Sequence, residues 1–266
     1  MMRQPMIVLA AFLMALAFVT PSGAHDQQPA ALREVAFEQR LGETVPLGLE
    51  FRDERGQSVT LGGLLAGRPA VVSLNQYGCP QLCPLVLEGL AQALRQTTVE
   101  LGREYVAITI GIDPREGPDV AAGRKRAIAR GYLSEHRADG WHFLTGNEYA
   151  VRRVAAAVGF RYAYDRANDA YAHPTGVVVV TPEGRVARYL FGADYGPRDL
   201  RLALVEASRG RLGGVADQLL LACYHYDAVS GRYTPAVMAV VRAAGVVTVV
   251  GMGLFLLVLC RRDPRR

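Results

Sequence analysis

Between residues 70 and 208, short runs of apolar and β-branched residues alternate with longer segments whose apolar residues recur at helical spacing. This alternation predicts strands and helices that pack in layers around one sheet. A hairpin is expected before them, within 44–61, around the turn-rich Asp53-Glu54-Arg55-Gly56. The expected strands are 70–74, 104–112, 141–144, 176–180 and 185–190, and the expected helices are 85–94, 120–136, 148–158 and 197–208.

The last two expected strands flank Thr181-Pro182-Glu183-Gly184, which is typical of a hairpin turn. Strands that alternate with helices and end in a hairpin and a helix predict an α/β fold, a thioredoxin-like three-layer sandwich with a central mixed sheet. This domain is expected to span residues 44–208, with 25–43 as an N-terminal extension and 209–235 as a juxtamembrane linker.

The two ends of the chain predict export and anchoring. Arg3, the apolar run 6–19 and the small residues Ser22 and Ala24 are typical of a signal peptide, residues 1–24, cleaved after Ala24. The run is short for a membrane span, and an uncleaved anchor is the alternative. By contrast, the largely apolar segment 236–260 is long enough to cross about 30 Å of hydrocarbon and predicts a C-terminal transmembrane helix.

The tail 261–266 is basic, and basic tails favour the cytoplasmic side. The domain is therefore expected on the outer side of the inner membrane, facing the periplasm or the cell exterior. The tail, Arg3 and Arg242 account for the net charge of +5, so the exported domain is close to neutral. Nothing in this balance favours a nucleic-acid partner.

The segment Cys79-Pro80-Gln81-Leu82-Cys83-Pro84 lies between an expected buried strand and an expected helix. A spacing of four residues is one helical turn, so the two sulfurs can face one point in space. If Cys83 starts the helix, the unpaired N–H groups and the positive end of the helix dipole favour its thiolate. In an oxidising compartment this pair predicts a disulfide, a metal site or both.

Soft thiolates select copper(I), zinc or an iron–sulfur cluster. Zinc usually takes four ligands and a cluster usually takes four cysteines, whereas only Cys79 and Cys83 of the four cysteines are close in sequence. Copper(I) accepts two or three ligands. The count favours copper, as Cu(I), with Cu(II) as the alternative state.

His173, just before the expected strand 176–180, is the expected third ligand. In a thioredoxin-like topology its loop lies beside the turn that carries the cysteines, and a neutral imidazole could complete the site. His136 and His142 are expected to be exposed or packing residues. His25 would follow the cleavage site and could chelate copper there, but we interpret it as an ordinary residue of the N-terminal extension.

Together these motifs resemble the Sco/SenC family of copper chaperones for cytochrome oxidase assembly, over about residues 44–208. The resemblance is carried by the 79–84 motif, by Asp113-Pro114-Arg115 after the next strand, and by His173 ahead of the run 177–184. It implies one copper ion bound by Cys79, Cys83 and His173, with Asp113 near the site. Alternatively, Asp113 caps the exit turn of its strand. The implied partners are the oxidase subunit that carries the copper centre and other copper chaperones or thiol reductants.

The chain departs from the family pattern in three places. The family usually has a further acidic residue shortly after its Asp-Pro-x-Arg segment, where Glu116 here precedes Gly117-Pro118. Pro174-Thr175-Gly176 replaces the family's small hydroxyl residues after the histidine, and the family's anchor is commonly N-terminal. These departures bear on the partner surface rather than on the ligands.

Several functions are compatible with these residues. The leading hypothesis is a metallochaperone, which is not an enzyme. The alternative is a thiol–disulfide reductase that keeps the cysteines of an oxidase copper site reduced, although thioredoxin-type enzymes usually have two residues between the cysteines. A peroxidase of the same fold and a purely structural disulfide are further readings. Cys223-Tyr224-His225 is either a second copper contact or, as we favour, a juxtamembrane segment with its tyrosines at the headgroups.

Overall fold

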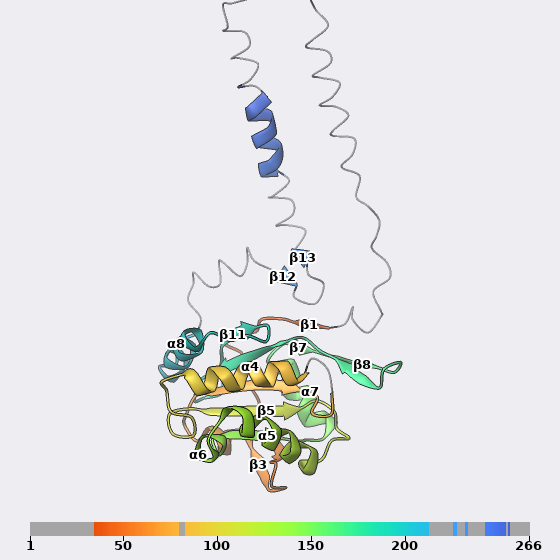
Figure 1. Ribbon diagram of the computed structural model, residues 1–266, viewed down its shortest axis with the longest axis vertical. Helices are drawn as coiled ribbons and strands as arrows, with labels where there is room; N and C mark the ends of the chain where they lie inside the picture. Colours follow the sequence, from red (N-terminus) through yellow and green to blue (C-terminus); the bar gives the residue numbers. More distant parts are fainter. Residues whose placement is uncertain are drawn as a thin grey trace, which may run out of the picture.

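A five-stranded mixed sheet with the strand order β11-β10-β4-β5-β6 forms the centre of the domain in the computed structural model (Figure 1). β4 (Ala70–Asn75), β5 (Val106–Gly111) and β6 (Trp141–Leu144) are parallel to one another. β10 (Gly176–Val180) runs antiparallel to β4 and to β11 (Val186–Phe191). The structure describes residues 35–79, 83–212, 226–227, 232–233, 243–253 and 255.

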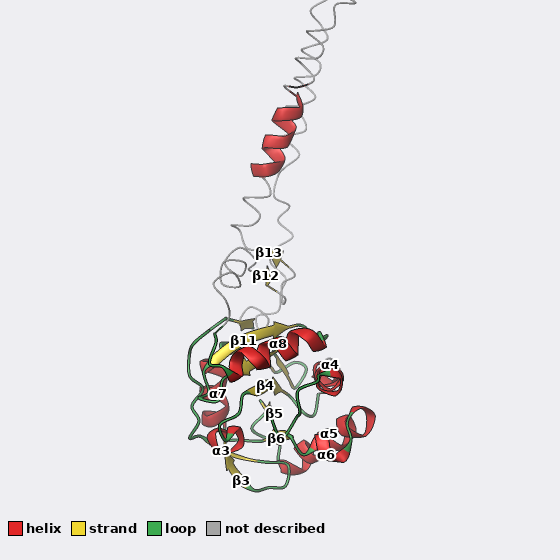
Figure 2. Ribbon diagram, turned by 90° about the vertical axis from the view of Figure 1, so that its left-hand side faces the viewer, coloured by secondary structure: helices red, strands yellow, loops and turns green. Residues whose placement is uncertain are grey.

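Helices cover both faces of this sheet, as the turned view in Figure 2 shows. α4 (Cys83–Gln96), α5 (Pro118–Tyr132) and α8 (Pro197–Ser208) lie on one face, and α3 (Leu61–Leu65) and α7 (Glu148–Ala157) lie on the other. Every residue of β4, β5 and β10 is buried, because both faces are covered. The predicted α/β fold with a central mixed sheet is confirmed.

The structure adds short elements that the sequence pattern did not predict. The expected hairpin is present as β2 (Glu50–Arg52) paired with β3 (Ser58–Thr60). β1 (Ala36–Phe37) pairs with β7 (Phe160–Arg161), and the backbone of Gly42 and Glu43 bonds to Val186. Residues 36–43 are therefore part of the folded domain, which differs from the expectation of a simple extension. The other short elements are α6 (Glu135–Ala138), β8 (Ala163–Asp165), β9 (Ala170–Ala172), β12 (Tyr226–Asp227) and β13 (Arg232–Tyr233).

The helix expected over 120–136 is divided in two. α5 ends at Tyr132 because Leu133 adopts an extended conformation, with φ −125° and ψ 148°, and α6 begins as a separate turn. Apolar spacing alone did not indicate this break.

The predicted membrane and export segments fall largely outside the described residues. The expected transmembrane segment 236–260 is described only at 243–253 and 255, where the chain is helical. No helix in the described part of the chain has both the length and the apolar character needed to cross a membrane. The signal peptide 1–24, the Cys223-Tyr224-His225 segment and the tail 261–266 also lie outside the described residues.

Candidate metal centre

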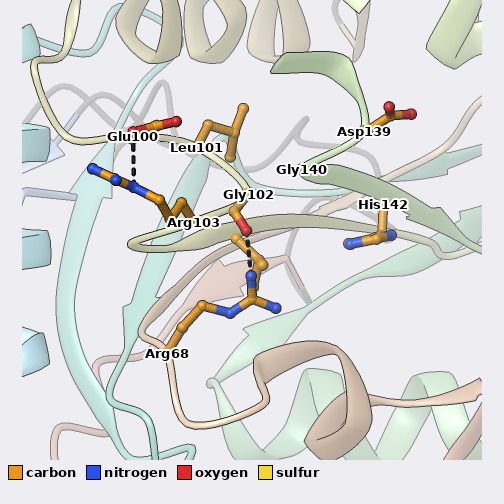
Figure 3. Close-up of a pocket in the computed structure, with 9 residues that line it drawn as sticks. Arg68, Glu100, Leu101, Gly102, Arg103, Asp139, Gly140 and His142 are labelled. Carbon is orange, nitrogen blue, oxygen red and sulfur yellow. Dashed lines mark hydrogen bonds and ion pairs between the residues drawn. The ribbon is translucent and has the colours of Figure 1, made fainter. Parts of the chain in front are cut away.

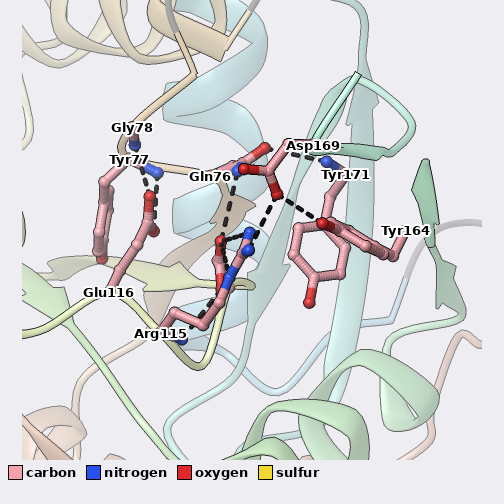
Figure 4. Close-up of polar contacts among 9 residues, drawn as sticks. Gln76, Tyr77, Gly78, Arg115, Glu116, Tyr164, Asp169 and Tyr171 are labelled. Carbon is pink, nitrogen blue, oxygen red and sulfur yellow. Dashed lines mark hydrogen bonds and ion pairs between the residues drawn. The ribbon is translucent and has the colours of Figure 1, made fainter. Parts of the chain in front are cut away.

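Two loops meet at the carboxyl end of β4, and each carries a predicted ligand. The cysteine loop leaves β4 after Asn75, and His173 precedes β10. Because β10 is antiparallel to β4, with Val178 opposite Val72, the start of β10 lies at the end of β4. The strand that leads into the histidine loop is bonded to the cysteine loop, since the backbone N–H of Tyr171 in β9 donates to the side-chain oxygen of Gln76 at 3.0 Å (Figure 4).

The two cysteines differ in how much of them the structure describes. Cys79 is half-buried, three residues beyond Gln76. Cys83 is the first residue of α4, two residues before the expected start of the helix at 85, so its amide lies where a helix favours a thiolate. The Cys83 side chain and residues 80–82 are outside the described part of the chain. Among the side chains that are described, no three from Asp, Glu, His and Cys form a group that could hold a metal ion, so the set of Cys79, Cys83 and His173 stays a prediction.

His173 has the protonation pattern that a metal ligand needs. Its Nδ1 lies 3.0 Å from the carbonyl oxygen of Pro174, and because a carbonyl only accepts, Nδ1 carries the hydrogen. A neutral ring in this tautomer has its lone pair on Nε2. Burial lowers the pKa of His173 below its ordinary value, although the bond to Pro174 opposes this effect. The imidazole is therefore neutral near pH 7.

Asp113 caps the turn after its strand, which was the alternative to its expected place near the copper site. Its carboxylate accepts the backbone N–H of Arg115 at 2.9 Å, which caps the turn after β5. The same buried carboxylate accepts from the Gln76 side chain at 3.5 Å, and Gln76 also contacts the loop of His173. Burial favours the protonated form, but hydrogen bonds from Arg115 outweigh it and hold the pKa of Asp113 below its ordinary value.

Arg115 extends this contact to the hairpin formed by β8 and β9. Its guanidinium bonds Asp113 at 2.7 Å and Asp169 at 2.9 Å, and it lies 5.3 Å from the centre of the Tyr164 ring. The Tyr164 hydroxyl also donates to Asp169 (Figure 4). Because Arg115 and Asp169 are exposed, the ion pair between them contributes little to stability. It orients the hairpin beside the candidate site.

Three side chains hold the backbone that leads into Cys79. The buried Tyr77 hydroxyl lies 2.9 Å from the carbonyl oxygens of both Thr109 and Leu144. Glu116 accepts the N–H groups of Tyr77 and Gly78 at 3.0 and 2.5 Å. Arg124 donates to the carbonyl oxygens of Tyr77 and Cys79, the latter at 3.2 Å.

Sequence reasoning did not identify Gln76, Glu116 or Arg124 as parts of the site. Each acts on backbone groups or on another side chain, and none has a residue type or spacing that marks it. The one available signal was Glu116, which follows Asp113-Pro114-Arg115 directly and was noted only as a departure from a family pattern. Burial raises the pKa of Glu116 above its ordinary value, against the effect of the two backbone N–H groups.

A cavity of about 400 Å³ lies at the other end of the sheet, near the starts of β5 and β6 (Figure 3). Its charged side chains have structural partners: Arg68 donates to the carbonyl oxygens of Leu64 and Leu65, and Arg103 pairs with Glu100 at 2.8 Å. His142, which lines this cavity, is half-buried, in keeping with the expectation that it is a packing residue. A second cavity of about 390 Å³ lies on the cysteine side, with Glu116 in its wall.

A family model, a curated protein and solved structures are similar to this chain. A family model described as SCO1/SenC matches residues 42–205. A protein of Stutzerimonas stutzeri named "Putative copper-binding protein" is 26% identical over 182 residues, which cover 67% of this chain and 84% of that protein. The crystal structure of a "putative electron transfer protein" from Aquifex aeolicus VF5 has a TM-score of 0.56 at 24% identity and covers 65% of this chain and 96% of its own. A structure of BsSco has a TM-score of 0.50 at 20% identity and covers 65% of this chain and 98% of its own. Its report describes a disulfide switch in BsSco, a member of the Sco family of cytochrome c oxidase assembly proteins. These two structures share the fold.

Proposed function

The chain belongs to the SCO1/SenC family, and from this membership we propose that it is a membrane-anchored copper metallochaperone that binds one copper ion through Cys79, Cys83 and His173. The ion is its cargo rather than a resident cofactor. The observation that carries the proposal is the bond between Tyr171 and Gln76, which joins β9, the strand that leads into the histidine loop, to the loop of the cysteines.

The chemistry of the donors supports copper(I). Cys83 at the start of α4 is favoured as a thiolate, and His173 is neutral with its lone pair on Nε2. Two soft sulfur donors and one imidazole suit copper(I), which accepts few ligands. A site with so few donors also leaves the ion open to an acceptor, whose own ligands can replace the cysteines one at a time. The proposed acceptor is the subunit of a cytochrome oxidase that carries the copper centre.

Copper(I) binding by the purified full chain in detergent tests this proposal. We expect one tightly held ion in the reduced protein, lost in Cys79→Ser and Cys83→Ser and weakened in His173→Ala, because each change removes one donor. His142→Ala is the matched control, since His142 lies at the opposite end of the sheet. Failure of the wild-type chain to retain copper(I) against a competing chelator would contradict the chaperone function.

A second candidate function is thiol–disulfide reduction, which the position of Cys83 also favours. A thiolate at a helix start is a better attacking or leaving group than an ordinary thiol. In that case the metal-free protein would reduce a protein disulfide at the same rate with or without His173→Ala. Both activities could reside in one protein, because both start from the reduced cysteine pair: copper(I) binding leaves the pair reduced, whereas reduction of a target disulfide leaves it as a disulfide.

A further inference from the structure

The backbone before Cys79 is held from one side by a carboxylate and by a guanidinium that belong to the segment from Glu116 to Arg124. Glu116 lies in the loop after β5, and Arg124 lies two turns into α5. Glu116 accepts two successive N–H groups, from Tyr77 and Gly78. Arg124 donates to the carbonyl oxygens of Tyr77 and Cys79. We call Glu116 and Arg124 the backbone clamp.

The clamp lies directly against the cysteine loop. A Cβ atom placed on Gly78 would be 3.1 Å from the Glu116 carboxylate, which is tighter than an ordinary contact. Both clamp residues are half-buried, so their bonds are less screened than bonds on an open surface. Hydrogen bonds to charged groups are also roughly twice as strong as neutral ones. The four backbone groups are therefore held more firmly than in a loop bonded only to water.

Neither clamp residue is required to bury the loop in the core. That role belongs to Tyr77, whose ring is fully buried and whose hydroxyl lies 2.9 Å from the carbonyl oxygens of Thr109 in β5 and Leu144 in β6. Removing a clamp bond should therefore loosen residues 78 and 79 while leaving the packing of Tyr77 intact.

We propose that Glu116 and Arg124 are positioning residues that fix the backbone of Cys79 and thereby set the affinity of the cysteine site for copper(I). This inference rests on the proposed function. The hydrogen bonds described between these two residues and the cysteine loop all go to backbone groups, so both residues act through the backbone. A loop that is already ordered loses less conformational entropy when it binds an ion, so the clamp increases affinity by preorganisation.

Five variants of the full chain in detergent test the clamp: Glu116→Gln, Arg124→Gln, their double variant, and the matched controls Glu148→Gln and Arg126→Gln. The controls remove the same charges from exposed positions on α7 and α5. We expect each single clamp variant to weaken copper(I) binding about 10-fold, the lower end of the usual effect of groups that support metal ligands. In the double variant, the fold-loss of copper(I) affinity should be smaller than the product of the two single fold-losses, because both residues hold the backbone of Tyr77. The controls should match the wild type.

Melting temperatures and two further variants separate positioning from a general loss of stability. Melting temperatures of the metal-free variants should stay close to the wild-type value, and Arg124→Lys should recover part of the affinity. Gly78→Ala, which removes no polar group but crowds Glu116, should also weaken binding. Wild-type affinity in both single clamp variants would overturn the inference, and so would losses of affinity that track the melting temperature in every variant.

The clamp and the proposed function can fail separately. If the wild-type chain binds copper(I) but the clamp variants bind it equally well, only the clamp is wrong. If the wild-type chain binds no copper, the reduction potential of the Cys79–Cys83 pair becomes the measurement. A change in potential in Glu116→Gln and Arg124→Gln, absent from the controls, would support positioning of the pair, and unchanged potentials would overturn it.

Discussion

Gln76 connects the two halves of the candidate site. Its side chain is buried, accepts the N–H of Tyr171 from the histidine side and donates to Asp113 from the β5 side. A single amide thus bonds to two segments that lie far from it in the sequence. This role suits glutamine because an amide carries both an acceptor and a donor.

Gln76→Leu should therefore weaken both the fold and the site. The Tyr171 N–H would lose its partner, and leaving a buried polar group unsatisfied costs about 1–3 kcal/mol. We expect urea unfolding to show that the free energy of unfolding falls by an amount in this range. Copper(I) affinity should also fall as the His173 loop separates from β4. Gln96→Leu, at the exposed end of α4, is the control. Unchanged stability and affinity in Gln76→Leu would show that the bond to Tyr171 does not hold the loops together.

Among single residues, the sequence pointed to those with distinctive chemistry and missed those that support them. Cys79, Cys83 and His173 were proposed as ligands because thiols and an imidazole stand next to predicted strands, and the family resemblance added Asp113. Gln76 and Arg124 could not be found in this way. Their function depends on which backbone groups the folded chain brings near them, and no spacing in the sequence encodes that.

Among the helices, α4 approaches the connection between β11 and α8 more closely than a side chain allows. A Cβ atom on Gly89 would lie 1.7 Å from the carbonyl oxygen of Ala193, which is backbone and cannot rotate away. Gly89 therefore permits the contact between α4 and the connection from β11 to α8, and this contact fixes the helix that begins with Cys83.

Gly89→Ala should destabilise the protein although alanine is the better helix former. In an open helical position the same change stabilises by about 1 kcal/mol, because alanine loses less backbone entropy. Gly123 in α5 is the matched control, since a Cβ there meets nothing within 4 Å. We expect thermal unfolding to show a lower melting temperature for Gly89→Ala and an unchanged or higher one for Gly123→Ala. Equal shifts in both variants would show that α4 can move away from Ala193.

The long elements were predictable, and the short ones were not. The core strands are continuous apolar runs because both faces of the sheet are covered, and such runs stand out in a sequence. The β8–β9 hairpin has three residues in each strand, which is too short for a periodic pattern. The break between α5 and α6 depends on the backbone of Leu133 rather than on apolar spacing.

For the molecule as a whole, the sequence-based proposal of a C-terminal anchor leads to a fractionation experiment. Segment 236–260 is largely apolar and is followed by a basic tail, so we expect the full chain to stay in the membrane fraction after an alkaline carbonate wash. A chain that ends at residue 235 should be released into the soluble fraction. Recovery of the full chain in the wash supernatant would contradict the anchor.

The pairing of β4 with β10 has a consequence for the order in which the molecule matures. Val72 and Val178 are neighbours in the sheet but are separated by most of the domain in sequence. Pairings between such distant segments form late, because a long loop must close before they gain any contacts. If the chain is exported as proposed, its cysteine pair is exposed well before the histidine loop joins it. Under the proposed copper function, these cysteines would meet oxidants first, and metal loading would begin only when the sheet was complete.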